Sequence, residues 1–236
     1  MATRALFAID EWYHCYNRGV EKRRVCMVKH DYERFQTLLY ACNGSASVKI
    51  SDRRKNSLAD ILSDVNLKRG EPLVEIGAYC LMPNHVHLLM KEIQPGGISI
   101  FMQKIFTGYT MYFNIKYRRT GALFAGVFKS RHIHNDEYLK TALPYILLNP
   151  CSLLDPRWKS GKANIASVQR ELLRYPYSSA PDFFDEKRIE NKLLTTDWSD
   201  YFDKKPSLTT MLKNAKEYNA SLPRGFALEH ALEQPL

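Results

Sequence analysis

The sequence predicts an α+β fold, in which helices pack on a compact antiparallel β-sheet. Two strand-like runs, at residues 73–81 and 85–92, are separated by Pro83-Asn84, which is typical of a turn, so they should form an antiparallel hairpin. Around this hairpin the patterns follow the order strand, helix, hairpin, helix, strand, helix. The chain has 236 residues and is 45% hydrophobic, so it can bury a substantial core. One antiparallel sheet covered by helices is the simplest arrangement of these elements.

The segment before the hairpin predicts a strand, a helix and an insertion. Residues 11–18 are rich in aromatic side chains, which favours a strand. Asp31 is expected to cap a helix that continues through Tyr40, because Asp is a preferred residue at helix N-termini. Residues 45–72 are polar and charged, which indicates a surface insertion with a short helix at 58–65.

The segment after the hairpin predicts two long helices with a strand between them. Apolar residues recur at helical spacing over 99–117, and a strand is expected at 123–133. Asp136 should cap the next helix, which should end at Asn149 because Pro150 disfavours helical backbone in the residue before it. Past residue 155 the pattern loosens into an extension, whose clearest helices are at 165–173 and 208–218.

The composition narrows the class of protein. Thirty-four Lys and Arg residues against 25 Asp and Glu residues leave a net charge of +9, which favours a polyanionic partner. Five cysteines are scattered without a Cys-x-x-Cys pair, so neither a disulfide framework nor a zinc ribbon is expected, and a reducing, cytoplasmic setting fits best. No signal peptide is evident, and no apolar run reaches the length of about 18 residues that a membrane span needs.

The first candidate site is the histidine pair in the second strand of the hairpin. Successive side chains of a strand point to opposite faces, so His85 and His87 share one face while Val86 and Leu88 share the other. Two imidazoles side by side are able to hold a divalent metal. The spacing fits equally well with a polar outer face above an apolar inner one.

The second candidate site lies in the helix that begins near Asp136. Tyr145 and Asn149 are four residues apart and therefore share one helical face, which puts a nucleophilic phenol beside an amide oxygen that can bind a metal. Tyr138 lies two turns earlier on the same face, so periodicity does not choose between the two tyrosines. Pro144 should kink the helix directly before Tyr145, because it lacks a backbone donor.

Several blocks of the sequence, taken in order, resemble the single-strand tyrosine transposases of small bacterial insertion sequences. The resemblance is to their REP-associated branch, a one-tyrosine family of HUH endonucleases, and it covers roughly residues 8–185. The matching blocks are YHCYNRG at 13–19, CLMPNHVHLL at 80–89, YFN at 112–114, RTGALF at 119–124, DEYL at 136–139 and YILLNP at 145–150, with a weaker echo YSS at 177–179.

This resemblance implies a fold and a division of the chain. The HUH core is a ferredoxin-like or RRM-like antiparallel sheet with helices on one face, expected here in residues 1–160. Residues 161–236 would form a mainly helical extension packed on that core.

The resemblance also implies a reaction. His85 and His87 match the paired metal ligands of the family, Tyr145 matches the nucleophile, and Asn149 matches the third protein ligand of a Mg²⁺ or Mn²⁺ ion. Tyr145 would attack a phosphate of single-stranded DNA near a REP-like hairpin, form a 5′-phosphotyrosine and release a 3′-OH. Attack by another 3′-OH would then transfer the strand. In this family the insertion-sequence transposases are dimers, whereas the REP-associated branch is thought to act as a monomer. The resemblance therefore implies a monomer or a homodimer.

Basic residues cluster near these blocks, with aromatic side chains beside several of them. Lysines and arginines that follow the phosphates, next to rings that stack on bases, are what binding of single-stranded DNA requires. We expect DNA contacts from Arg18, Lys22, Arg23, Arg24, Lys116, Arg118, Arg119, Lys129 and Arg131.

Two other functions remain open from the sequence. A domesticated, non-catalytic protein that binds structured single-stranded DNA would keep the basic surface and would not depend on Tyr145. A zinc hydrolase would use His85 and His87 together with His132 and His134, a second pair at alternate strand positions.

Overall fold

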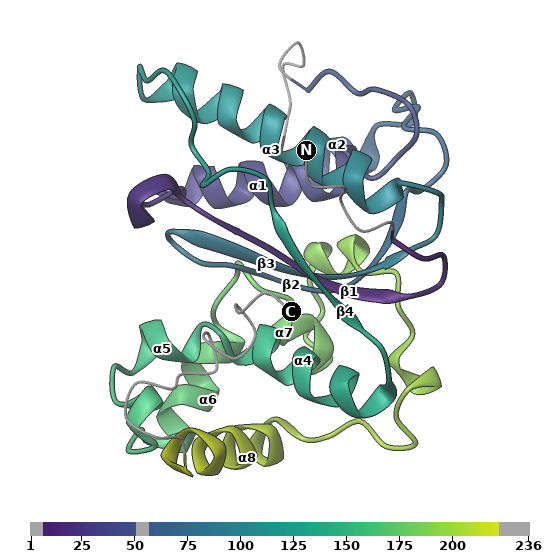
Figure 1. Ribbon diagram of the computed structural model, residues 1–236. Coiled ribbons are helices and arrows are strands. Elements are labelled where there is room, and N and C mark those ends of the chain that lie inside the picture. Colours follow the sequence, from purple (N-terminus) through teal and green to yellow (C-terminus); the bar gives the residue numbers. More distant parts are fainter. Residues whose placement is uncertain (1–6, 51–56, 222–236) are drawn as a thin grey trace.

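The computed structural model describes residues 7–50 and 57–221, with side chains placed up to residue 217 (Figure 1). Its centre is one antiparallel sheet of four strands in the order β2-β3-β1-β4. This is the order expected when two strand–helix–strand units interleave, and the predicted α+β class is confirmed. The strands are β1 (Trp12–Arg18), β2 (Val74–Leu81), β3 (His85–Glu92) and β4 (Lys129–Ile133).

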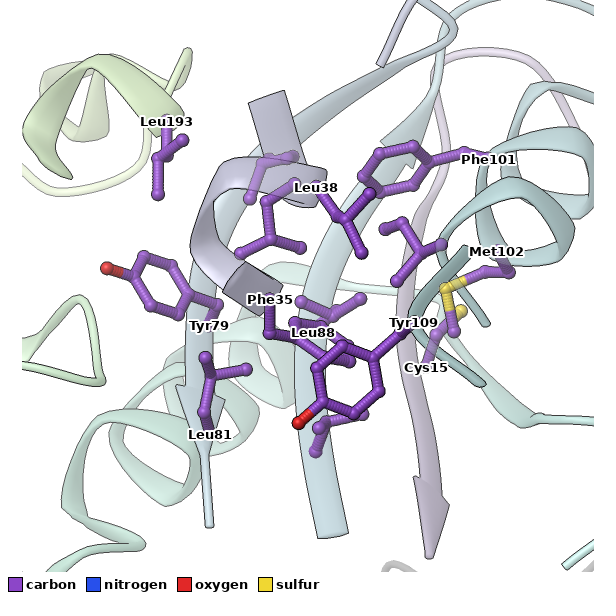
Figure 2. Packing of buried hydrophobic residues seen from close by; sticks show 14 of the residues in the cluster. Cys15, Phe35, Leu38, Tyr79, Leu81, Leu88, Phe101, Met102, Tyr109 and Leu193 are labelled. Carbon is purple, nitrogen blue, oxygen red and sulfur yellow. The ribbon is translucent and has the colours of Figure 1, made fainter. Parts of the chain in front are cut away.

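One face of the sheet is buried under α1 (Lys29–Ala41) and α3 (Gly97–Lys116) (Figure 1). Alternate side chains of the central strands, such as Cys15 and Leu88, point to this side and pack with Phe35 of α1 and Tyr109 of α3 (Figure 2). Tyr109 satisfies its buried hydroxyl by donating to the carbonyl oxygen of Val25 at 2.6 Å. This is the layer of helices that the sequence predicted.

The opposite face of the sheet is also covered, which adds a third layer to the expected arrangement. Helix α4 (Asp136–Leu148) packs against β2, β3 and β4 on this side. Trp12 and Leu89 project from the strands into a cluster with Leu143 and Ile146 of α4. The central strands also carry apolar side chains such as Trp12 and Leu89 on this face, and a helical layer on the other face alone would leave them in water.

Several element boundaries differ from the sequence predictions, and three of the differences concern helix caps and β4. Helix α1 begins at Lys29, and Asp31 caps it from the third position by accepting from the backbone N–H groups of Met27 and Val28 at 2.8 and 3.0 Å. Asn135, not Asp136, caps α4, because its side chain accepts from the N–H of Tyr138 at 2.8 Å. Strand β4 is shorter than predicted.

The missing part of β4 is an irregular loop over residues 123–128. Gly126 adopts a left-handed backbone with φ of 74°, which a regular strand does not allow. Only Phe124 makes an isolated bridge, to Gly19 beyond the end of β1. The loop therefore runs beside the segment that follows β1.

The polar insertion contributes to the core despite its composition. Helix α2 (Leu58–Ser63) buries Leu58 and Ile61 against the α1 side of the sheet, and Ile50 is buried there as well. The expectation of a purely surface insertion is therefore too simple for the described part of this segment.

The described part of the C-terminal extension packs on the sheet. The backbone of Tyr177 and Ser179 pairs with the free edge of β2, through Leu81 N–H to Tyr177 O at 2.8 Å and Ser179 N–H to Tyr79 O at 2.9 Å. The remaining elements are η1 (Val20–Lys22), α5 (Cys151–Leu154), η2 (Trp158–Ser160), α6 (Ile165–Leu173), α7 (Ala180–Phe183), η3 (Ile189–Leu193), η4 (Trp198–Asp200) and α8 (Leu208–Ser221).

Farther along the extension, Trp198 stacks on Trp12 of β1, with ring centroids 5.7 Å apart. Across the described ranges, none of the helices has the length and apolar character required to cross a bilayer.

Candidate active site

The pairing of β1 with β3 gathers polar side chains on the sheet face that α4 covers. Tyr16 lies opposite His87, and Arg18 lies opposite His85. Residues directly opposite each other in an antiparallel pair project to the same side. The ring centroids of His85 and His87 are 4.9 Å apart, and we call this side of the sheet the histidine face.

His14 is part of this group, although the sequence analysis did not single it out. Its Nε2 lies 2.9 Å from Nδ1 of His87, and both side chains are buried at 1% exposure. The signal was present in the alternation of Trp12, His14 and Tyr16, which places His14 on one face of β1. The contact with His87 depends on the register between β1 and β3, which local periodicity does not contain.

Burial determines the protonation of both histidines. Burial, followed by the nearby guanidinium of Arg131, lowers the pKa of His14 to about 3. Burial, followed by His85, His14 and Arg18, also lowers the pKa of His87 well below its ordinary value. Both rings are therefore neutral near pH 7, and a single proton lies between His14 Nε2 and His87 Nδ1.

Hydrogen bonds at Nδ1 orient the rings of both predicted ligands. The Nδ1 of His85 lies 2.7 Å from Oδ1 of Asn84, so this ring nitrogen donates to the amide oxygen. The Nε2 of His87 is buried and has no hydrogen-bond partner among the described residues. Asn84 was interpreted from sequence only as a turn residue, and its side chain orients His85.

This donor set fits a divalent metal. Neutral imidazoles that are held by a second hydrogen bond on Nδ1 are the usual form of histidine ligands. Within the described ranges, no three His, Cys, Asp or Glu side chains come together in an arrangement that could hold a metal ion. A metal bound here would therefore need an additional oxygen ligand, such as the amide of Asn149 or a substrate phosphate.

Helix α4 brings Tyr145 to the histidine face. The Tyr145 ring lies 5.5 Å from the His87 ring and 5.8 Å from the His14 ring, centroid to centroid, in edge-to-face orientations. Helix α4 continues through Pro144 without interruption. The register between the proline and the end of the helix is therefore retained.

Tyr138 occupies a different environment on the same helix. Its ring lies 5.5 Å from the guanidinium carbon of Arg131 and 5.6 Å from the ring of His134. The aromatic contacts with His14 and His87 are made by Tyr145. Geometry thus separates two tyrosines that helical periodicity left equivalent.

Asn149 is the residue at the C-terminal cap of α4, one turn after Tyr145. Its backbone is still helical, with φ of −53° and ψ of −38°, and its side chain is buried. Tyr145 and Asn149 both line a cavity of about 460 Å³ between α4 and α8. The predicted relation between these two residues is therefore present in the fold.

Three of the nine predicted DNA-binding residues lie on the histidine face. Arg18 is opposite His85 on the neighbouring strand, Arg131 is opposite His14, and Lys129 is opposite Tyr16. These three cations surround the neutral histidines, which leaves this face with a positive potential.

The other predicted cations lie away from this face or take part in local contacts. Lys116 donates to Asp31 Oδ1 at 2.6 Å, which ties the end of α3 to the start of α1. Arg119 donates to Asn114 at 2.6 Å, and Arg23 pairs with Glu21 at 3.3 Å. Lys22 at the end of η1 is exposed, as are Arg24 and Arg118 in loops.

The second histidine pair does not join the first. His132 lies opposite Tyr13 and so projects from the other face of the sheet, where its Nε2 is 3.0 Å from a carboxylate oxygen of Glu11. His134 lies beyond the end of β4. The four-histidine arrangement required for the zinc hydrolase is therefore absent from the described residues.

Comparisons with known proteins give one structural likeness. No protein-family model matches the chain, and no curated protein matches it. A solved structure of a REP-associated tyrosine transposase bound to a REP hairpin is similar over 84% of this chain and 92% of the other, with 13% identity and a TM-score of 0.48. At that score and identity, the likeness supports no conclusion about the site.

Proposed function

We propose that the protein is a metal-dependent endonuclease and strand transferase for single-stranded DNA, with Tyr145 as the nucleophile. The observation that carries this proposal is the Tyr145 ring 5.5 Å from the ring of His87, on the face that also holds His85. The ordered sequence blocks that resemble REP-associated tyrosine transposases support the same assignment of Tyr145 and the two histidines. They also suggest the substrate, a single strand next to a REP-like hairpin.

Tyr145 would perform a transesterification. Its phenolic oxygen forms a bond to the scissile phosphorus, the bond from phosphorus to the 3′ oxygen breaks, and the departing oxygen takes up a proton to become a 3′-OH. The number of phosphate diesters is unchanged, so no external energy source is required. A second 3′-OH reverses the step and joins the strand to a new partner.

The chain's own residues would prepare this attack. A free phenol has a pKa of about 10, so Tyr145 needs help to ionise at neutral pH. His85, His87 and Asn149 would hold the divalent metal, which when bound supplies positive charge to the phosphate. Neutral histidines are suited to this role, because they leave the charge of the ion undiminished.

Arg18, Lys129 and Arg131 would hold the phosphates of the DNA on either side of the cleaved bond. They lie on the strands that flank His85 and His87, on the same face of the sheet. Their positive potential would raise the local concentration of the polyanionic strand.

The direct test is a search for a covalent protein–DNA adduct. The full-length protein would be incubated with Mn²⁺ and a labelled pool of hairpin oligonucleotides whose single-stranded flanks are randomised. Adducts would be separated on denaturing gels, and the attached strand would be sequenced. We expect the wild type to form the adduct.

Two matched tyrosine variants decide which residue is the nucleophile. Tyr145→Phe should abolish the adduct, whereas Tyr138→Phe, on the same helix, should retain it. An adduct that survives in Tyr145→Phe would refute the assignment. Tight hairpin binding by a wild type that forms no adduct under any metal condition would instead favour the non-catalytic DNA-binding protein.

A further inference from the structure

A cavity between α4 and α8 opens beside the proposed nucleophile, and apart from Tyr145 and Asn149 the residues that line it have no role in the reaction described above. Its volume of about 460 Å³ lies within the range of about 300–1,000 Å³ typical of pockets for small organic ligands. Tyr145 and Asn149 form part of one wall, and Trp158 lies on another. Any molecule in the cavity is therefore next to the proposed nucleophile.

The walls of the cavity combine an apolar interior with positive charge. Pro144, Leu148, Trp158, Phe202 and Met211 supply apolar and aromatic surface. Lys140, Lys159 and Lys204 also contribute to the lining, and the described lining residues include no Asp or Glu. The complementary ligand has a flat, largely apolar body and carries negative charge.

We propose that this cavity binds one deoxynucleotide of the single-stranded DNA, namely the nucleotide whose 5′-phosphate is attacked by Tyr145. The inference rests on the proposed function and adds a subsite for the strand that stays attached to Tyr145 after cleavage. The base would contact the aromatic and apolar wall, and the lysines would face its phosphates. Such a site holds the strand in place after cleavage, while the phosphotyrosine waits for an incoming 3′-OH.

Binding can be measured without metal and without cleavage, which keeps this test separate from the adduct assay. The protein has three tryptophans, and Trp158 is the one in the cavity lining. Protein labelled with 5-fluorotryptophan would be titrated with the four deoxynucleoside 5′-monophosphates and followed by ¹⁹F NMR. Trp158→Phe assigns the resonance.

We expect the Trp158 resonance to shift on titration with the nucleotides, while the resonance of Trp12 on β1 stays in place. The matching uncharged nucleosides should bind at least tenfold more weakly. Octanoate, an apolar anion without a base, should also bind more weakly. Equal shifts with nucleosides or with octanoate would overturn the assignment, as would the absence of any shift with the nucleotides.

A second arm distinguishes a nucleotide of a strand from a free nucleotide. A 5′-phosphorylated hexathymidylate should move the Trp158 resonance, and its 5′-hydroxyl counterpart should do so less. If monophosphates bind but neither hexamer does, the cavity holds free nucleotides and the proposal for the strand is wrong.

Two kinds of variant test the walls. The triple variant Lys140→Gln, Lys159→Gln, Lys204→Gln should weaken nucleotide binding at least tenfold. The matched triple Lys162→Gln, Lys187→Gln, Lys213→Gln removes the same charge from exposed residues outside the lining and should change binding by less than twofold. Equal losses of nucleotide affinity in both triple variants would mean that only the net charge of the protein matters, and would overturn the proposal.

Asn214→Trp fills the cavity from its exposed rim and should block binding without removing a cation. Unchanged nucleotide affinity in this variant would place the ligand elsewhere. An adduct formed by a protein that fails these binding tests would refute only the subsite. Nucleotide binding by a protein that forms no adduct would refute only the proposed reaction.

Discussion

Replacing His14 by Phe tests whether this buried residue prepares His87 for a metal. The Nε2 of His14 lies 2.9 Å from Nδ1 of His87, and neither side chain is accessible to water beyond 1%. If His87 binds a metal through Nε2, its Nδ1 must carry the proton and donate it to His14. Phe keeps the aromatic ring and removes the acceptor.

The magnitude follows from the loss of one buried hydrogen bond to a metal ligand. Removing such a partner typically weakens metal binding by about 10- to 100-fold, or about 1.4–2.7 kcal/mol. The free energy of unfolding should change by about 1 kcal/mol. The variant leaves His87 Nδ1 without its partner, but it also removes the buried Nδ1 of His14, which has no hydrogen-bond partner among the described residues.

Titration with Mn²⁺, followed by the electron paramagnetic resonance of the free ion, measures the affinity directly, and urea unfolding measures stability. His30→Phe is the matched control, because His30 is exposed on α1. His14→Gln, whose amide oxygen is able to accept from His87, should recover part of the affinity. Equal Mn²⁺ affinity of wild type and a folded His14→Phe protein would refute the reasoning.

Further predictions concern individual polar side chains. Asp31→Asn should lower the free energy of unfolding by about 2–4 kcal/mol, because this buried carboxylate accepts from Lys116, Tyr117 and the backbone at the start of α1; a loss below 0.5 kcal/mol in urea titrations would contradict this. Burial alone would raise the pKa of Asp31, but those hydrogen bonds outweigh it and lower the pKa from 3.8. The stabilisation is therefore present above about pH 4 and disappears as the pH falls through the folded pKa, so only the wild type should lose this contribution in acid, and parallel acid curves would count against the assignment. Lys116→Met should lower the free energy of unfolding and leave DNA affinity within about twofold of the wild type. Loss of DNA affinity without loss of stability would mean that Lys116 contacts DNA. Lys129→Gln should reduce the salt dependence of single-strand binding by about 0.7 in the log–log slope, and an unchanged slope would exclude a phosphate contact. His87→Ala should abolish adduct formation while hairpin affinity persists, whereas loss of both would mean that the histidine supports the fold or touches DNA.

Much of the fold could be predicted because it depends on local patterns. The period of two residues in 85–92 placed Val86 and Leu88 in the core opposite the histidines, and the structure has them there. Helix α6 lies at the predicted residues 165–173. The prediction failed where a short-range choice had several solutions, as at Asp31, which caps α1 from its third position and not from the N-cap.

The candidate site was only half visible in the sequence. His85, His87, Tyr145 and Asn149 were found through spacing and ordered blocks, whereas His14 and Asn84 were not. His14 contacts His87, and Asn84 accepts a hydrogen bond from His85. Such hydrogen bonds leave no signal in composition or periodicity. Lys116 shows the converse, since a basic residue beside a family block is paired with a buried carboxylate in the fold.

By itself, the sequence determined which side chains share a face: His85 with His87 on a strand, and Tyr145 with Asn149 on a helix. Those relations depend on backbone geometry over a few residues. Only the tertiary structure decided that Tyr145 meets the histidine face. The register of β1 against β3 brings His14 to His87, and the docking of α4 on the sheet places Tyr145 against these two rings and Tyr138 against Arg131. The contacts among His14, His87 and Tyr145 are between segments about 60 to 130 residues apart, set by which apolar surfaces bury each other, and no local pattern encodes that choice.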